Sequence, residues 1–336
     1  MNPDESTYLN AARAGDQEAF AQLIEPYRKQ LLVHCYRILG SFEDAEDMLQ
    51  ETLLRVWKRL SSFEGRASLR VWLYKVATNA ALDALDSRRV RGLPKELYAR
   101  GDPSQPLPSP SQEVNWVEPL PDEWIDGQPD IYPEARYEVR ESITLAFIAA
   151  LQKLPGRQRA VLLLCDVMGW SSIEAAEILD MTTAAVNSAL QRARETLKQA
   201  ERKTRPSRLN EQLSALLARY IAAWETADSA ALIAVLREDV ALTMPPLPVW
   251  FGGRADIQTF LDGFLFRSRD PFNVRLEAVR ANGSPAFAVY QMDQAGVFRA
   301  AALHILTIEN GQITEINDFL SFDGRLFSRF HLDLLV

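Results

Sequence analysis

The segment from Gly92 to Tyr137 most restricts what this chain can fold into, because it holds nine of the chain's 18 prolines. Proline lacks a backbone N–H donor and disfavours helical geometry in the residue before it. Asp and Glu recur in the same stretch. We therefore expect an extended acidic linker at 92–136. Trp116 and Trp124 do not suit a simple spacer, so they are expected to dock onto a protein surface.

The linker and a second, shorter hinge divide the chain into three folded parts. Residues 1–91 and 137–203 show helical periodicity with few breakers, and Lys203–Arg208 forms a second short hinge. Residues 209–336 begin with a helix, Leu209–Glu225, and become strand-like. The expected strands are Val274–Arg280, Ala286–Met292, Val297–Ile308 and Ile313–Leu320. Asn-Gly pairs at 282–283 and 310–311 indicate hairpins.

These patterns predict a multidomain protein. Two all-α domains, a helical bundle and a helix-turn-helix, precede a C-terminal α+β domain with helices on one face of a curved antiparallel sheet. A polar N-terminus and the lack of a long apolar run predict no membrane segment, no signal peptide and a cytoplasmic location. The net charge of −8 argues against a free-standing DNA-binding protein, unless local basic patches or a partner supply positive charge.

The two cysteines, Cys35 and Cys165, each lie in an apolar helical stretch. We expect buried, reduced thiols. Neither cysteine has a histidine or a second cysteine at metal-ligand spacing, so no metal site and no cofactor are predicted.

The helix expected at Glu43–Leu60 has two different faces. Its apolar stripe comprises Ala45, Met48, Leu49, Leu53, Val56, Trp57 and Leu60. Leu54 lies on the opposite face with Asp47, Gln50 and Glu51. A single exposed leucine is common in folded proteins. Ringed by polar groups, it is also typical of the centre of a docking patch. The residues alone leave both interpretations open.

The next helix begins after Ser68, a suitable N-cap. An aromatic, a basic and an amide side chain share one of its faces, which suits single-stranded nucleic acid. The residues on this face are Trp72, Lys75, Asn79 and Asp83, and those flanking it are Phe63, Arg66, Arg88 and Arg89. The arginines also fit a simpler role as cations at a helix C-terminus.

A helix-turn-helix is expected after Leu154-Pro155, with its turn at Asp180–Thr182 and its second helix from Thr183 to about Ala200. An ordinary amphipathic helical hairpin is the alternative. Outward side chains of the second helix would reach base edges or phosphates. These candidates are Thr183, Ala184, Asn187, Ser188, Gln191, Arg192 and Arg194.

Two runs resemble the second sigma domain of extracytoplasmic-function sigma factors, namely DAEDMLQETLLRVWKRL (Asp44–Leu60) and FEGRASLRVWLYKVATNAALDALDSRRVR (Phe63–Arg91). Residues Leu154–Leu197 resemble the fourth sigma domain. The resemblance implies that Asp47, Gln50, Glu51 and Leu54 bind the β′ clamp helices of core RNA polymerase. It also implies that the second run melts and reads the promoter −10 element, with the Phe63–Ala67 loop holding an extruded base. The fourth domain would read the −35 element and meet the β flap. In this family the interdomain linker passes the polymerase active site.

Residues from about 209 resemble, more weakly, SnoaL-like and nuclear-transport-factor-2-like domains, which are cone-shaped and enclose an apolar pocket. The candidate pocket residues are Trp250, Arg254, His304 and Asp318, and Asp239 is a further candidate acid. No acid–base pair follows from the sequence, so no catalysis is predicted. A subgroup of sigma factors carries such an extension together with a Trp- and Pro-rich linker motif, which Trp116–Trp124 resembles. In that subgroup the extension modulates activity, implying a contact between the C-terminal domain and the linker or the sigma domains.

The preferred hypothesis is a sigma factor regulated by its C-terminal domain. One alternative is a helix-turn-helix activator with a small-molecule sensor domain, and another is an enzyme fused to a DNA-binding module. Only the first accounts for the docking face, the −10 helix and the acidic net charge together.

Overall fold

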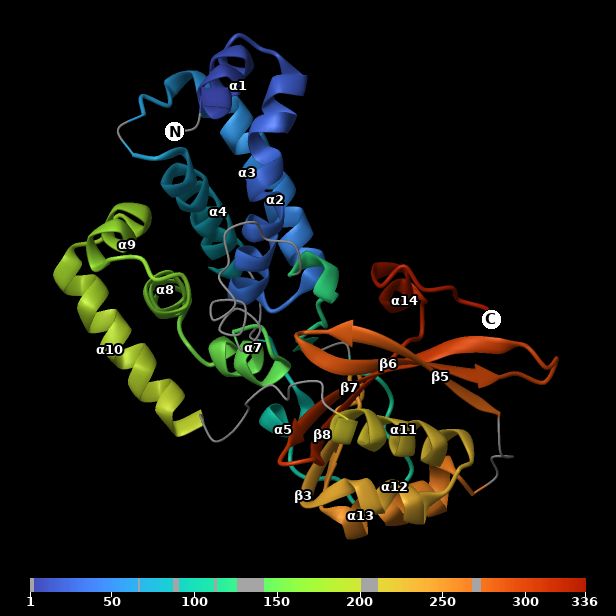
Figure 1. Cartoon of the computed structure of the whole chain (residues 1–336). Coiled ribbons are helices and arrows are strands. Elements are labelled where there is room, and N and C mark those ends of the chain that lie inside the picture. Colours follow the sequence, from blue (N-terminus) through green and yellow to red (C-terminus); the bar gives the residue numbers. More distant parts are fainter. Residues whose placement is uncertain are drawn as a thin grey trace. The chain divides into compact units, whose positions relative to one another are not determined.

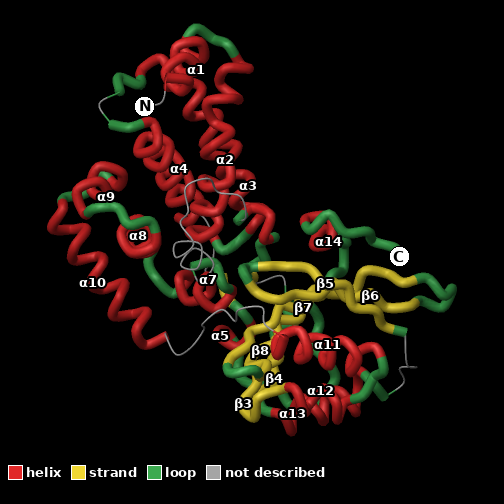
Figure 2. Tube along the Cα trace, in the orientation of Figure 1, coloured by secondary structure: helices red, strands yellow, loops and turns green. Residues whose placement is uncertain are grey.

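A computed structural model describes residues 3–65, 67–86, 91–111, 114–125, 142–200, 211–267 and 273–336. The chain forms two compact units (Figures 1 and 2). Unit 1 comprises Met1–Arg91 and Val117–Arg202, and unit 2 comprises Gly92–Trp116 and Lys203–Val336. The linker therefore divides between the units, at the bond between Trp116 and Val117. Within the described residues, no helix combines the length and apolarity needed to cross a membrane.

Unit 1 is helical. Its elements are α1 (Pro3–Arg13), α2 (Gln17–Leu39), α3 (Phe42–Arg59), η1 (Leu60–Ser62), α4 (Leu69–Asp86), η2 (Asp122–Trp124), α7 (Leu145–Gln152), α8 (Gly156–Leu162), η3 (Leu163–Val167), α9 (Ser172–Leu179) and α10 (Thr183–Ala200). The second half of α2 is buried on every side, from Leu31 to Leu39. A helix that is buried on every side needs neighbours on every side. Helices α3, α4, α7 and α8 provide them.

The C-terminal part of the linker belongs to this core. Val117 and Leu120 are fully buried. The Glu118 carboxylate accepts hydrogen bonds from the backbone N–H groups of Phe42 and Glu43, at 3.1 and 3.3 Å. A negative charge at the start of α3 is stabilised there by the helix dipole. The Trp124 ring packs on Phe42, so this short segment is a strap fastened at the α2–α3 corner.

Unit 2 is α+β. Its elements are α5 (Pro94–Leu97), β2 (Asn115–Trp116), α11 (Glu211–Glu225), α12 (Ser229–Val235), β3 (Leu236–Thr243), β4 (Trp250–Gly252), α13 (Arg254–Phe260), η4 (Leu261–Leu265), β5 (Val274–Ala281), β6 (Ser284–Met292), β7 (Phe298–Glu309), β8 (Gln312–Leu320) and α14 (Arg325–Arg329). Strand β1 (Arg91–Gly92) begins at the boundary with unit 1.

The sheet of unit 2 has the strand order β4-β3-β8-β7-β6-β5. Both Asn-Gly pairs make the predicted two-residue hairpins, and all four of their residues have positive φ. Positive φ at both central residues gives the turn a twist that matches the right-handed twist of the paired strands. The sheet is antiparallel except where β3 runs parallel to β8. Strands β3 and β4 were not among the four predicted strands, and they extend the sheet beyond β8.

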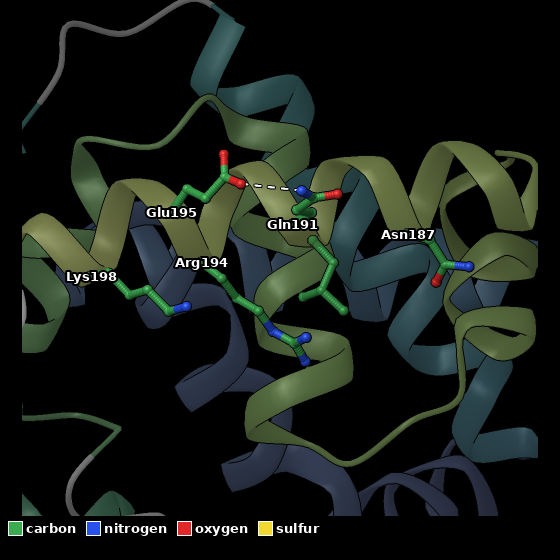
Figure 3. A pocket seen from close by; sticks show the side chains of 6 residues that line it. Asn187, Gln191, Arg194, Glu195 and Lys198 are labelled. Carbon is green, nitrogen blue, oxygen red and sulfur yellow. Dashed lines mark hydrogen bonds between the residues drawn. The ribbon is translucent and has the colours of Figure 1, made fainter.

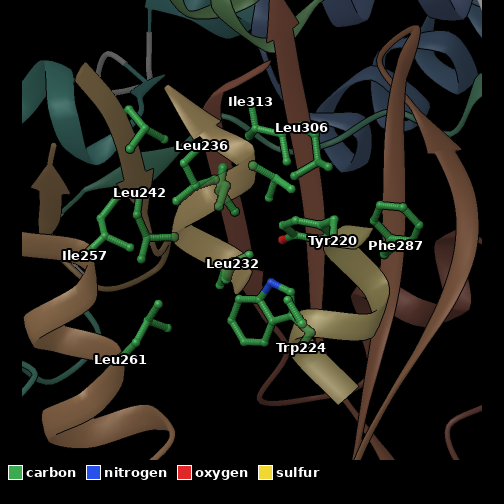
Figure 4. Packing of buried hydrophobic residues seen from close by; sticks show 14 of the residues in the cluster. Tyr220, Trp224, Leu232, Leu236, Leu242, Ile257, Leu261, Phe287, Leu306 and Ile313 are labelled. Atoms are coloured by element: carbon green, nitrogen blue, oxygen red, sulfur yellow. The ribbon is translucent and has the colours of Figure 1, made fainter. Parts of the chain in front are cut away.

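One large apolar core lies inside unit 2. Figure 4 shows five buried members of this core: Tyr220 and Trp224 of α11, Ile257 of α13, Leu306 of β7 and Phe287 of β6. A smaller cluster forms around Phe327 of α14, Ala288 and Tyr290.

The N-terminal part of the linker, residues 92–111, packs on the β4 margin of this sheet. The Gly101 N–H donates to the Trp250 carbonyl at 2.9 Å, and the Trp250 indole N–H donates to the Tyr98 carbonyl at 3.0 Å. Lys95 pairs with the largely buried Glu315 at 2.5 Å, and Arg100 pairs with Asp256. Because β4 is an edge strand, its free backbone groups are a natural site for a further extended segment.

His34 makes the stability of unit 1 sensitive to acid. Its Nε2 lies 2.8 Å from the Thr78 hydroxyl, and burial together with the Arg37 charge lowers the pKa of His34 to about 3. The unfolded chain binds a proton near pH 6.5 and the folded chain does not, so stability is lost as pH falls from 6.5 towards 3. Between pH 6.5 and 5 we expect this residue to remove about 2 kcal/mol.

Urea unfolding as a function of pH tests this expectation. His34→Gln keeps a hydrogen-bonding group and should flatten the loss between pH 6.5 and 5. The control is His331→Asn, at an exposed position with positive φ that Asn tolerates, and it should leave the pH profile unchanged. Equal acid sensitivity in wild type and His34→Gln would contradict the assignment.

Candidate nucleic-acid interface

The outward face of α3 carries the four predicted docking residues. Asp47, Gln50 and Leu54 are exposed, and Glu51 is half-buried. Leu54 is 55% exposed, which is high for a leucine in the middle of a helix. Glu51 pairs with Arg55 at 2.7 Å, one turn along the helix. The result is an apolar centre with an acidic rim.

The predicted face of α4 is only partly open. Trp72, Lys75 and Asn79 are half-buried, and Asp83 is exposed and pairs with Arg55 at 3.1 Å. Phe63 is buried and stacks on Trp72, with ring centroids 4.9 Å apart. The Arg13 guanidinium also lies over the Phe63 ring, 5.8 Å from its centroid. Arg66, Arg88 and Arg89 lie outside the described residues.

Lys75 was predicted to contact DNA, but in the structure it forms an ion pair within the protein. Its ammonium lies 2.6 Å from Asp180 Oδ1 and donates to the Glu177 carbonyl at 3.0 Å. Both acceptors belong to the end of α9, more than 100 residues further along the chain.

Helices α9 and α10 form the predicted helix-turn-helix. Ser171 and Glu174 make a reciprocal capping box at the start of α9, and Asp180 ends it in the left-handed conformation. Helix α10 buries the inward side chains that its periodicity predicts, among them Val186, Ala189 and Ala193. All seven predicted recognition residues are exposed: Thr183, Ala184, Asn187, Ser188, Gln191, Arg192 and Arg194.

A shallow groove of about 400 Å³ lies along α10 and is lined by Asn187, Leu190, Gln191, Arg194, Glu195 and Lys198. Figure 3 shows Asn187, Gln191, Arg194 and Lys198 on successive turns of this helix. Gln191 donates to Glu195 at 3.1 Å. Arg194 makes two hydrogen bonds with Asp166, at 2.9 and 2.6 Å, and this contact raises the pKa of Arg194. The guanidinium is therefore held in one orientation by η3.

A buried polar chain crosses the interior of unit 2. The Tyr220 hydroxyl lies 2.8 Å from His304 Nδ1, and Asp318 Oδ1 lies 3.4 Å from His304 Nε2. Burial and the Asp318 charge raise the pKa of Tyr220. The Trp224 ring lies 4.6 Å from the imidazole, centroid to centroid. Tyr220 was not predicted, although its place one turn before Trp224 in an apolar helix put it on the same inward face.

The other predicted pocket residues have different partners. Trp250 donates to the linker carbonyl of Tyr98, and Arg254 Nε donates to the Leu236 carbonyl at 2.8 Å. Asp239 is exposed and pairs with Arg237. No group of three or more potential metal ligands occurs within the described ranges.

Family models match three parts of the chain: Sigma-70 region 2 at residues 23–91, Sigma-70 region 4 at 144–197, and a SnoaL-like domain at 217–316. The chain is 44% identical to the ECF RNA polymerase sigma factor SigG of Mycobacterium tuberculosis over 325 residues, which cover 95% of this chain and 85% of SigG. This chain belongs to the ECF sigma factors.

Other relatives agree with this assignment. The ECF sigma factor SigW of Bacillus subtilis is 29% identical and covers 56% of the chain. The crystal structure of the M. tuberculosis ECF sigma factor SigJ superposes over 93% of this chain and all of its own, with a TM-score of 0.59 and 21% identity, which supports the fold. The protein is thus an ECF sigma factor with a C-terminal SnoaL-like domain, and not a helix-turn-helix activator with a sensor domain.

The polar chain of this ECF sigma factor predicts a contrast between two buried tyrosines. Tyr220→Phe leaves His304 Nδ1 buried without its partner, and we expect a loss of about 1–3 kcal/mol of stability. The Tyr290 hydroxyl is buried and has no hydrogen-bond partner in the described structure. Tyr290→Phe should therefore be neutral or slightly stabilising. The test compares the urea concentrations at which the two variants are half unfolded. Equal midpoints would contradict the structural role of the Tyr220–His304 bond.

Proposed function

We propose that this sigma factor binds the β′ clamp helices of core RNA polymerase through the α3 face formed by Asp47, Gln50, Glu51 and Leu54. In this proposal α4 reads and opens the −10 element. Helix α10 reads the −35 element, and its domain meets the β flap. The observation that carries the proposal is the exposed Leu54 at the centre of an acidic rim, in the region that matches Sigma-70 region 2.

The α3 face has the features of a small hot spot. An exposed aliphatic side chain gains free energy when a partner covers it, and surrounding polar groups exclude water and set the orientation. Acidic residues at the rim favour a basic partner surface and speed association with it. The sequence is acidic overall, so polymerase would supply part of the positive charge needed to hold promoter DNA.

Leu54→Arg tests the docking face. The substitution places a charge where an apolar contact is expected, and we expect core affinity to fall by about 10-fold or more, equivalent to at least about 1.4 kcal/mol. Phe322→Arg is the control, because Phe322 is 67% exposed in the C-terminal domain, outside the proposed face. Fluorescence anisotropy of labelled factor titrated with core polymerase gives both affinities. Wild-type affinity in Leu54→Arg would refute the docking assignment.

We also propose that the C-terminal domain modulates the factor by holding the linker. Residues 95–101 place two cations on Glu315 and Asp256 and add a backbone hydrogen bond to the β4 edge. By resemblance to the family, the same linker passes the polymerase active site during initiation. One segment cannot occupy both positions, so the C-terminal domain restrains the factor until the linker is released.

Gly101 offers a way to release the linker within the full chain. A Cβ at this position would lie 2.6 Å from a methyl group of Val249 and 3.1 Å from the Phe251 ring, so Gly101→Val must displace the segment. We expect run-off transcription at limiting factor to rise by about threefold or more. Gly263→Ala, where a Cβ meets no atom within 4 Å, is the matched control and should behave as wild type. Unchanged or lower transcription from Gly101→Val would contradict restraint by the linker contact.

We infer that the C-terminal domain is regulatory and not catalytic. The support is that His304 and Asp318 are buried and that Tyr220 and Trp224 enclose the imidazole. Because the proposed partner, core RNA polymerase, works in the cytoplasm, we propose that this protein acts there too.

A further inference from the structure

One side chain from α1 ties together the turn that leads from α3 into the loop expected to hold an extruded promoter base. Arg13 Nε donates to the Leu60 carbonyl at 3.4 Å, and Arg13 Nη2 donates to the Phe63 carbonyl. Leu60 begins η1 and Phe63 follows it, so one guanidinium bridges both ends of this turn. Carbonyls at the end of a helix lack helical donors, and a cation is favoured beside them. The backbone of residues 60–65 is therefore held from outside α3 and α4.

Arg13 is presented by a helix that is itself anchored. It is the last residue of α1, in which Leu9 and Ala12 are 4% and 3% exposed. The Tyr27 hydroxyl of α2 donates to the Glu5 carboxylate of α1 at 3.2 Å. The match to Sigma-70 region 2 begins at residue 23, so it does not include α1. A packed helix outside that match thus supplies the group that holds the turn.

The same guanidinium reaches an aromatic stack. It lies over the Phe63 ring, 5.8 Å from the centroid, and that ring stacks on Trp72 with centroids 4.9 Å apart and planes at 28°. Phe63 is 8% exposed, whereas Trp72 of α4 is half-buried. A ring must offer a free face to stack on a base. Trp72 keeps accessible surface for a base, and Phe63 is placed to support it.

Order in this turn matters because extruding a base is costly. Taking a base out of the stack requires free energy for unpairing and unstacking, which contacts in the receiving pocket must offset. A loop that becomes ordered only on binding loses conformational entropy in the same step. When hydrogen bonds and a stacked ring already hold the turn, that entropy is lost during folding instead. Promoter opening is then faster, because less free energy is needed at the step that captures the base.

We propose that Arg13 is a positioning residue for promoter opening. It holds residues 60–65 by their backbone and, through Phe63, holds the Trp72 ring in the form that receives an extruded base of single-stranded DNA. Arg13 and Phe63 themselves do not contact that base. The inference rests on the function proposed above, in which α4 reads and opens the −10 element, and it adds the group that orders the reading surface beforehand.

Arg13→Ala tests the positioning role in the holoenzyme. The promoter is the best-bound sequence from a randomised duplex library selected with wild-type factor and core polymerase. The fluorescent base 2-aminopurine, which brightens when it leaves the stack, replaces one at a time the −10 bases that tolerate it. We expect Arg13→Ala to slow the rise at the extruded position by about 10-fold and to change core affinity by less than about twofold. Arg28→Ala, at an exposed position on α2, is the matched control and should behave as wild type. Wild-type opening rates in Arg13→Ala would overturn the proposal.

Two further measurements separate positioning from a direct phosphate contact. Arg13→Lys keeps the positive charge but lacks the planar fork that reaches two carbonyls, so it should remain at least about threefold slower than wild type. A side chain that neutralises a phosphate of single-stranded DNA contributes about 0.7 to the slope of log affinity against log salt. We expect Arg13→Ala to leave this slope unchanged. Full recovery in Arg13→Lys, or a slope smaller by about 0.7 in Arg13→Ala, would overturn positioning in favour of a direct contact.

A double-mutant cycle tests the route through the aromatic stack. Phe63→Leu keeps a buried apolar side chain but removes the ring that supports Trp72, so it should slow opening by about threefold or more. Because both changes act on the same turn, the double variant should be slower than Arg13→Ala alone by less than about twofold. Losses that multiply would overturn the route from Arg13 through Phe63. A wild-type holoenzyme without a fluorescence rise at any −10 base would instead count against the proposed function, and the inference would fall with it.

Discussion

The packing of unit 1 depends on a buried arginine whose hydrogen bonds, within the described residues, go to neutral groups. Arg159 of α8 is 4% exposed, and its guanidinium donates to the Ile38 carbonyl, the Gln152 side chain and the carbonyls of Gln152 and Leu154. Burial lowers the pKa of Arg159 to about 10. A buried cation without a carboxylate is expensive unless hydrogen bonds replace its hydration. Ile38 supplies part of that replacement from the C-terminal end of α2, where carbonyls carry partial negative charge.

This interaction joins the part of unit 1 that matches Sigma-70 region 2 to the part that matches region 4. Arg159 Nε is buried and has no hydrogen-bond partner in the described structure. Loss of the contact with α2 would remove the hydrogen bond to Ile38 and leave those to Gln152 and Leu154. Arg37 makes a comparable contact with the Ser142 hydroxyl at 2.6 Å, and burial lowers its pKa to about 10. Burying these two cations costs free energy, which the surrounding hydrogen bonds and apolar contacts must offset.

Local patterns in the sequence predicted the elements whose stability is local. The predicted helix from Thr183 to Ala200 has the same bounds in the structure, because its apolar spacing and its turn residues lie within one stretch of chain. The Asn-Gly hairpins follow for the same reason. Strand β3 was missed because it follows α12 without a turn signal and pairs with β8, about 75 residues further on. Its identity as a strand is determined by that distant partner.

The predictions for the candidate site show the same difference between local patterns and contacts of distant residues. Outward positions on α3 and α10 follow from helical periodicity, and the structure exposes Leu54 and all seven residues predicted on α10. Lys75 also lies where periodicity puts it, but its partner Asp180 belongs to a separate helix pair and no local pattern connects them. The linker shows the same limit. Its described residues, 92–111 and 114–125, hold only short elements, yet Val117 and Leu120 are fully buried because a partner surface was available at the α2–α3 corner.

The division of the linker has a mechanical consequence that joins these observations. Residues up to Trp116 belong to the C-terminal unit, and residues from Val117 belong to the unit that contains both sigma domains. The strap at Glu118 and Trp124 caps α3, the helix with the proposed polymerase face. Under the restraint proposed above, a change in how the C-terminal domain holds Lys95 and Arg100 would reach this strap along roughly 25 residues of chain. A proline-rich segment suits this role, because it is stiffer than an ordinary flexible linker.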